Sequence, residues 1–240
     1  MVYEIRGKIP QNSNYLYSED VLTGTIFGNL RYFSCQKILI DFLNEAVNLE
    51  NEKLSIADDN IFLMHFWEKY KAKTTNNYNE PDLVLENDNC VIIIECKYFS
   101  VLDEQNEEHD IQPVYKNQLI RYSTIINEYY GNKTEKIIVF LTNEKTKPTE
   151  ILQNTITRID KDIKLYWLSW IKLHKCLLNN VNYKKNEKLL NNDLCNFLLK
   201  RRLVGFNGFS VNKIDYSRFY QKKYIFNKLF KKITWRYRNE

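Results

Sequence analysis

The sequence is poor in glycine and proline and has no long apolar run. Its 240 residues include only 6 Gly and 4 Pro, which excludes a collagen-like fibre and low-complexity disorder. The longest aliphatic run, Val-Ile-Ile-Ile at residues 91–94, is far shorter than the roughly 20 apolar residues that cross a bilayer. We therefore expect a globular chain without a membrane segment.

Paired metal-binding cysteines are also lacking. The five cysteines form no CxxC pair, and the three histidines match no metal-binding spacing, which argues against a zinc ribbon. Residues 1–7 contain no apolar core followed by small residues, and we therefore expect no secretory signal. An odd number of cysteines without such a signal predicts reduced thiols and a cytoplasmic location.

The charge is unevenly distributed along the chain. Residues 200–240 contain 12 Lys and Arg against two acidic residues, a balance of +10, so the preceding 199 residues carry −5 of the total of +5. Such asymmetry points to an anionic partner for the basic end, although a solvated helix face would look similar. We predict an α/β domain over residues 1–178 and a basic, aromatic-rich helical extension over residues 179–240.

The hydrophobic pattern alternates between helices and strands. Ser18 is a predicted N-cap, with Glu19 and Asp20 in the first turn of a helix. This helix pauses near Ser34 and resumes to about Val47. Further along, the pattern predicts a strand-like region at 61–70, a hairpin at 82–98, a helix at 112–130, strands at 136–141 and 165–168, and a helix at 170–178. This order predicts an α/β fold whose sheet is covered on both faces.

Charged residues stand at the ends of the predicted hairpin strands. Glu95 and Lys97 lie on one face of an otherwise apolar strand, because side chains alternate along an extended chain. Antiparallel pairing brings Asp82 roughly opposite residues 93–95. Two converging carboxylates beside a lysine suit Mg²⁺ or Mn²⁺ and the hydrolysis of a phosphate ester.

This arrangement resembles the PD-(D/E)xK superfamily of restriction-endonuclease-like nucleases. Pro81-Asp82 is followed after twelve residues by Glu95-Cys96-Lys97, and a later helix carries Gln118 and Tyr122 in a Q-x-x-x-Y pattern. The resemblance covers about residues 15–170. It implies an αβββαβ core with a mixed central sheet flanked by helices.

The resemblance also implies a role for individual residues. Asp82 and Glu95 would bind the divalent cation, with Glu19 as a further metal-binding carboxylate. Lys97 would assist the hydrolytic water, and Gln118 would shape the site. Cys96 is expected to be a core thiol because it faces away from the two charges.

Several of these residues have ordinary alternatives. Glu19 could be a plain helix N-terminal carboxylate, Asp20 could take its place, and Gln118 could lie on a solvated helix face. Glu80 is a further carboxylate, ranked lower because it precedes Pro81 in a loop. Tyr122 is interpreted as a structural or phosphate contact.

The basic end mixes cations with aromatic rings, a combination that suits phosphate neutralisation and base stacking. Packing of these rings on the domain is an alternative. The glycines at 205 and 208 indicate a loop whose purpose the sequence does not reveal. The predicted nucleic-acid contacts are Arg201, Arg202, Lys222, Lys223, Lys231 and Lys232.

The leading functional hypothesis is a Mg²⁺-dependent DNA nuclease, with Mn²⁺ as a substitute. By analogy it would serve restriction or anti-phage defence, with a homo-oligomer or a regulatory protein partner to restrain it. One alternative is a non-catalytic subunit that binds nucleic acid or protein on a nuclease-like scaffold. A ribonuclease or a structure-selective resolvase would share the chemistry.

Overall fold

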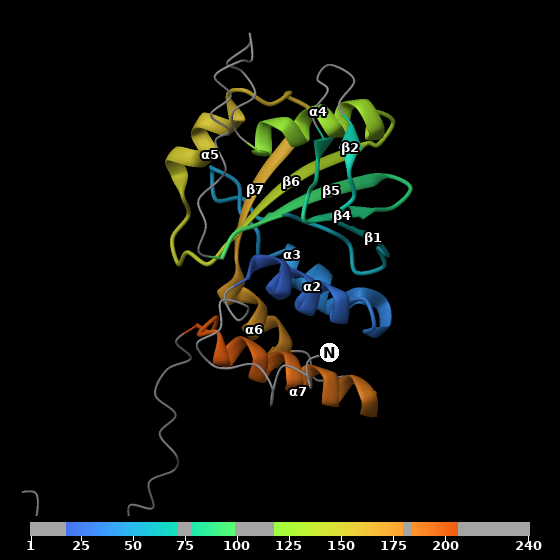
Figure 1. Cartoon of the computed structure of the whole chain (residues 1–240), viewed down its shortest axis with the longest axis vertical. Helices are drawn as coiled ribbons and strands as arrows, with labels where there is room; N and C mark the ends of the chain where they lie inside the picture. Colours follow the sequence, from blue (N-terminus) through green and yellow to red (C-terminus); the bar gives the residue numbers. More distant parts are fainter. Residues whose placement is uncertain (1–17, 72–77, 99–117, 180–183, 206–240) are drawn as a thin grey trace, which may run out of the picture. The chain divides into compact units, whose positions relative to one another are not determined.

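The computed structural model describes residues 18–71, 78–98, 118–179 and 184–205. They form a mixed sheet with helices on both faces (Figure 1). The helices are α2 (Glu19–Leu30), α3 (Lys37–Leu43), α4 (Gln118–Tyr130), α5 (Thr149–Ile156), α6 (Trp170–Asn179) and α7 (Lys185–Lys200), with a 3-10 turn, η2 (Ser34–Gln36), before α3. The strands are β1 (Leu63–Phe66), β2 (Tyr70–Lys71), β3 (Tyr78–Asn79), β4 (Leu83–Glu86), β5 (Cys90–Cys96), β6 (Glu135–Thr142) and β7 (Ile163–Ser169).

Five strands make the central sheet in the order β1-β4-β5-β6-β7. The first three are antiparallel, and the side chain of Asn87 closes the β4–β5 turn by accepting the backbone N–H of Cys90 at 2.8 Å. β6 and β7 then join in parallel, which requires a crossover connection before each strand. Helix α4 lies in the connection to β6, and α5 lies in the connection to β7. The prediction of a mixed α/β fold with a central β hairpin is confirmed.

The sheet is covered on both faces, as predicted. All seven residues of β5 are buried, as expected for a central strand. Its even-numbered residues, such as Ile92 and Ile94, face a core built with α2, α3, α6 and α7. Val91 and Ile93 face the opposite core, which contains α4. In Figure 1 the two groups of helices lie on opposite sides of the sheet.

The first helix begins where the sequence places it. The Ser18 side chain accepts the N–H of Val21, and α2 starts at Glu19. The predicted pause near Ser34 corresponds to η2. The helix that follows ends at Leu43, short of the predicted Val47, because the next side chain, Asn44, bonds both the N–H and the carbonyl of Ile56.

The predicted strand over residues 61–70 is wrong in extent. Only β1, four residues long, forms there, and Trp67 directly after it has a φ of 50°. That left-handed backbone conformation cannot continue a strand. The short β2–β3 ribbon and helix α5 were not predicted, since two-residue strands and an eight-residue helix leave little periodic pattern.

The chain divides into two units, residues 1–205 and residues 206–240, and the second lies outside the described residues. α7 packs within the first unit, where Leu194 and Leu198 join the core, whereas the sequence places the start of the extension after residue 178. That division stays a prediction.

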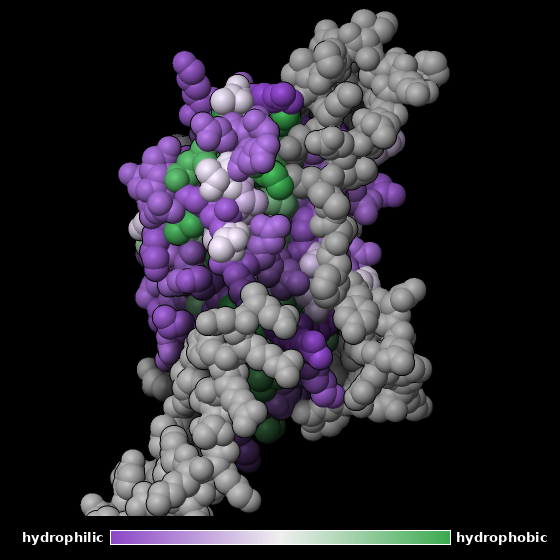
Figure 2. Space-filling model, turned by 90° about the vertical axis from the view of Figure 1, so that its left-hand side faces the viewer, coloured by the Kyte–Doolittle hydropathy of each residue, from purple (hydrophilic) through white to green (hydrophobic). Residues whose placement is uncertain are grey.

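The surface of the first unit is largely polar on the side that Figure 2 presents, with apolar side chains scattered among hydrophilic ones. No helix in the described part of the chain is both long and apolar enough to cross a membrane.

Candidate active site

Asp82 and Glu95 lie side by side at one end of the hairpin. Leu83 of β4 pairs with Ile94 of β5, so the residues one step further out, Asp82 and Glu95, meet beyond that pair. A carboxylate oxygen of Asp82 accepts the backbone N–H of Cys96 at 2.7 Å, which fixes the aspartate against the strand that carries Glu95. The structure therefore brings the two predicted carboxylates together.

Lys97 and Glu95 form a buried ion pair. The Lys97 ammonium lies 2.7 Å from Glu95 Oε1, and the two side chains are 12% and 2% exposed. The backbone N–H of Lys97 donates to the carbonyl of Leu141 at 2.7 Å, so the main chain stays aligned with β6 beyond the end of β5. The alternation predicted for this strand places both charges on one face, and Cys96 is buried in the opposite core.

Glu19 is tied to the same strand end from another element. As the first residue of α2, it accepts the backbone N–H of Tyr98 at 2.6 Å. Because Tyr98 directly follows Lys97, this bond anchors the start of α2 beside the site. Asp20 and Glu80 are both exposed, and Glu80 lies 3.5 Å from Lys69.

Tyr122 is a site residue to which the sequence analysis gave only a structural or phosphate-contact role. Its hydroxyl donates to Glu95 Oε2 at 2.5 Å, and its side chain is buried. Gln118 is half-buried and begins α4, one helical turn before Tyr122. The Q-x-x-x-Y spacing places these two side chains on one helix face, and this was the signal that could have identified the tyrosine.

Burial and neighbouring carboxyl groups perturb the acids of the site. Burial, reinforced by the charges of Glu95 and Glu19, raises the pKa of Asp82 to about 8. Burial also raises the pKa of Glu95, although the Lys97 charge and the Tyr122 hydroxyl oppose that shift. Burial lowers the pKa of Lys97, but the carboxylates outweigh it and the net pKa is raised. Carboxyl groups whose charged forms are destabilised by burial and by one another favour the binding of a cation.

The donor set suits a hard divalent cation. Carboxylate oxygens are the ligands that Mg²⁺ and Mn²⁺ prefer, and the carboxyl groups of Glu19, Asp82 and Glu95 influence one another electrostatically. Among the described residues, however, no group of three or more His, Cys, Asp or Glu side chains is arranged to hold a metal ion. In this structure the protein's own donors engage the carboxylates instead.

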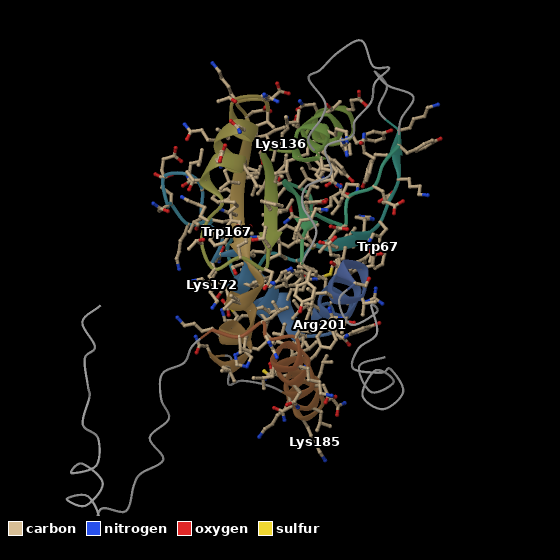
Figure 3. The ribbon with its side chains drawn as sticks, turned by 60° about the vertical axis from the view of Figure 1, so that its left-hand side comes forward. Trp67, Lys136, Trp167, Lys172, Lys185 and Arg201 are labelled. Atoms are coloured by element: carbon tan, nitrogen blue, oxygen red, sulfur yellow. The ribbon has the colours of Figure 1, made fainter. Side chains whose placement is uncertain are left out.

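Arg201 does not fit the predicted contact with nucleic acid. Its side chain is buried, and the guanidinium lies over the rings of Phe197 and Tyr98, at 4.7 and 5.5 Å from their centroids. Figure 3 places it in the interior, near α2 and α7. A buried guanidinium stacked on aromatic rings is not presented to a phosphate at the surface, so this prediction needs correction.

Among the other predicted nucleic-acid contacts, Arg202 lies in the described part of the chain. Arg202 is exposed and has a φ of 58° at the end of α7. Lys222, Lys223, Lys231 and Lys232 lie outside the described residues, as does the loop between the glycines at 205 and 208.

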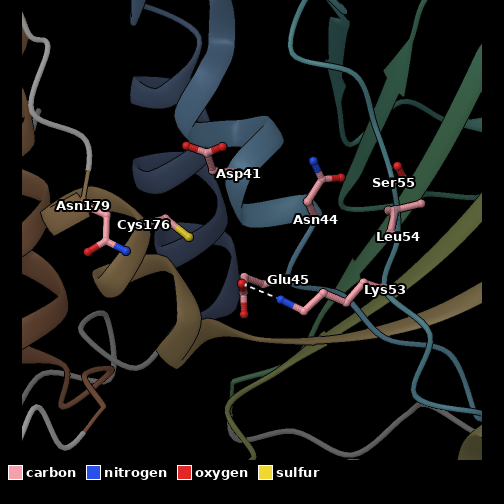
Figure 4. A pocket seen from close by; sticks show the side chains of 8 residues that line it. All are labelled: Asp41, Asn44, Glu45, Lys53, Leu54, Ser55, Cys176 and Asn179. Atoms are coloured by element: carbon pink, nitrogen blue, oxygen red, sulfur yellow. Dashed lines mark hydrogen bonds and ion pairs between the residues drawn. The ribbon is translucent and has the colours of Figure 1, made fainter.

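A cavity of about 550 Å³ lies elsewhere in the molecule (Figure 4). Its lining includes Asp41, Glu45, Lys53 and Cys176, and none of the predicted site residues. Lys53 pairs with Glu45 at 2.9 Å across it. The cavity is therefore separate from the acidic site.

Comparisons with protein-family models, with curated proteins and with solved structures gave no match. The functional assignment therefore depends on the site itself.

Proposed function

We propose that the chain is a divalent-metal-dependent nuclease that hydrolyses phosphodiester bonds, with DNA as its substrate. The observation that carries this proposal is the convergence of Asp82, Glu95 and Lys97 at one end of a buried hairpin. A structural role alone gives no reason for two buried carboxylates with raised pKa values beside one lysine, whereas perturbed acids cluster at functional sites.

The fold supports the same assignment. The elements α2, β1, β4, β5, α4 and β6 occur in this order along the chain, with η2 and α3 between α2 and β1 and the small β2–β3 ribbon between β1 and β4. With the additional elements set aside, this order agrees with the αβββαβ core that the resemblance implies. We propose that the mixed sheet is such a core, and that the acidic site occupies the position of the family's metal centre.

Each side chain has a distinct part in the proposed chemistry. Asp82 and Glu95 would hold the cation, Mg²⁺ or Mn²⁺, with Glu19 as a further carboxylate. The cation, when bound, supplies Lewis-acid polarisation of the phosphate. Lys97 orients the attacking water and stabilises negative charge that develops on the phosphate. Tyr122 holds the Glu95 carboxylate in place, and the resemblance implies products with a 3′-hydroxyl and a 5′-phosphate.

A non-catalytic, nucleic-acid-binding subunit is the second candidate. It is favoured by one observation, that the described carboxylates are not arranged as a metal cluster. The intact set of Asp82, Glu95 and Lys97 favours the enzyme instead. A ribonuclease or a structure-selective resolvase would use the same side chains on another substrate. In the cell we propose a defence or restriction role, with DNA and a restraining protein or second copy as partners.

Cleavage assays test the proposal directly. The full chain is incubated with linear, nicked, branched and single-stranded DNA and with RNA, in Mg²⁺, Mn²⁺ or EDTA. We expect cleavage of DNA that EDTA abolishes, and no cleavage by Asp82→Ala or Lys97→Ala. Asp58→Ala, which alters an exposed carboxylate outside the site, should cut normally. Full cutting by an Asp82→Ala, Lys97→Ala double variant would overturn the assignment.

A further inference from the structure

Protein groups engage both oxygens of the Glu95 carboxylate. Lys97 takes Oε1 at 2.7 Å and Tyr122 takes Oε2 at 2.5 Å. With the glutamate only 2% exposed, water has little access to this carboxylate. Its negative charge is therefore compensated by the lysine ammonium.

A cation that binds Glu95 is repelled by the Lys97 ammonium. Two positive charges that share one carboxylate oxygen lie within a few ångströms of each other, and their repulsion is strong where solvent screening is weak. Breaking a buried ion pair is also costly if one partner stays uncompensated. Exchange of the ammonium for a metal cation avoids that cost, because the charge of Glu95 is compensated throughout.

The lysine has the freedom to make this exchange. Its backbone N–H is held by the Leu141 carbonyl, so the main chain can stay in place while the flexible side chain moves. The side chain is 12% exposed, in contrast to 2% for Glu95, so Lys97 is the more accessible member of the pair. Asp82 and Glu19 are close enough to act on its charge.

On the basis of the proposed function, we propose that Lys97 is the built-in counter-ion of the metal-free site and that a divalent cation binds Glu95 by displacing its ammonium. The ion pair therefore sets the metal affinity of the resting protein. Lys97 is released for its part in the reaction only when the cation is present. Metal binding and positioning of the lysine become a single event.

Metal titration of the full chain tests this exchange without any substrate. Lys97→Met keeps the length of the side chain and removes its charge. We expect calorimetry with Mn²⁺ to show binding at least about tenfold tighter than that of the wild-type chain, because no ammonium has to be displaced. Lys97→Arg, which keeps the charge, should remain within about threefold of the wild type.

Lys133 provides a matched control. Its ammonium pairs with Glu86 at 2.8 Å and its side chain is 10% exposed, so it resembles Lys97 in burial and charge but lies outside the site. Lys133→Met lowers the net charge by the same amount and should leave Mn²⁺ affinity unchanged. An equal gain in both methionine variants would mean that overall charge, and not the exchange, controls the affinity.

A measurement on the wild-type chain covers the case in which Lys97→Met fails to fold. The ¹⁵N signal of the Lys97 ammonium should shift when diamagnetic Mg²⁺ is added, while that of Lys133 stays in place. Bound Mg²⁺ with an unchanged Lys97 signal would overturn the exchange, as would Mn²⁺ binding by Lys97→Met that is no tighter than wild type. Those outcomes leave the proposed nuclease intact, whereas a wild-type chain that binds no metal defeats both proposals.

Discussion

Two buried glutamates of this protein have pKa values displaced in opposite directions. Glu95 lies in the candidate site, and its pKa is raised mainly by burial. Glu187, near the start of α7, accepts the hydroxyl and the N–H of Ser34 at 2.6 and 2.7 Å and the N–H of Lys184 at 2.9 Å. These bonds lower its pKa to about 2. At Glu187 hydrogen bonds outweigh the effect of burial, whereas at Glu95 the Lys97 ammonium and the Tyr122 hydroxyl only partly offset it.

The difference separates a structural carboxylate from a reactive one. At Glu187 the donors come from two segments that the glutamate joins, so its charge stabilises the docking of α7. At Glu95 the nearest other charges include Glu19 and Lys97, and one ammonium serves several carboxylates. We infer that the sharing of one ammonium by several carboxyl groups makes the site suitable for a cation. Substitutions at the two glutamates and their neighbours test this contrast.

Replacement of Glu95 by glutamine should have the largest effect. Glu95→Gln keeps the shape of the side chain but removes its charge, so cleavage should fall by about 10³-fold or more. Stability should change by less than about 1 kcal/mol, because Asp82 and Glu19 still face Lys97. Single-turnover cleavage and urea unfolding measure the two effects. A variant that unfolds readily yet cuts normally when folded would reverse the roles of the two glutamates.

The pH dependence of stability should have opposite signs at the two kinds of carboxylate. Asp82 has an ordinary pKa of 3.8 and a folded pKa of about 8, so the folded state holds its proton more tightly. The stability that this carboxyl contributes is fully present below pH 3.8 and is lost as the pH rises toward 8. Asp82→Asn should remove that loss and stabilise the metal-free protein at pH 8, on the order of 2 kcal/mol.

Chemical unfolding with EDTA at several pH values measures this effect. The amide oxygen that Asp82→Asn introduces can still accept the Cys96 N–H, so the hydrogen bond is preserved as a control on geometry. Adding Mg²⁺ should stabilise the wild-type chain at pH 8 and leave Asp82→Asn nearly unaffected. Equal stability of the two chains at pH 5 and pH 8 would contradict a raised pKa at Asp82.

Replacement of Glu187 should weaken the fold without affecting the chemistry. Glu187→Gln puts an amide where three donors need acceptors, so the free energy of unfolding should fall by about 1–3 kcal/mol at pH 7. Because the folded pKa of about 2 lies below the ordinary 4.5, the contribution of Glu187 is present above pH 4.5 and is lost as the pH falls toward 2. The stabilities of the two chains should converge over that range, while cleavage of the folded variant at pH 7 stays within about twofold.

The contrast also shows what could be predicted from the sequence. The convergence of Asp82, Glu95 and Lys97 could be predicted because a hairpin is a local structure. Its side chains alternate between two faces, and its register follows from the turn. Glu187 was not, since its partner Ser34 is 153 positions away. Neither was the burial of Arg201, because stacking on Tyr98 depends on contacts 103 positions apart. Charge alone made that arginine resemble a phosphate contact.

The role of Tyr122 could be predicted only in part. Its spacing from Gln118 was visible, but the contact with Glu95 depends on how α4 is rotated against the sheet. The pattern placed the two residues on one helix face, and only the packing of that face against Val91 and Ile93 shows which strand residue it reaches. Local periodicity predicts a face, whereas a partner requires the tertiary structure.

The smallest expected effects come from removing one hydroxyl group that donates a hydrogen bond to each glutamate. Tyr122→Phe deletes a donor to Glu95, and Ser34→Ala deletes one donor to Glu187 while the Ser34 N–H remains. Tyr122→Phe should lower the rate of cleavage by about three- to tenfold, since a freer carboxylate is less well positioned. Ser34→Ala should lower the free energy of unfolding by about 1 kcal/mol and leave the rate unchanged. If both variants altered stability alone, Tyr122 would be a packing residue, and the hydrogen bond would no longer distinguish Glu95 from Glu187.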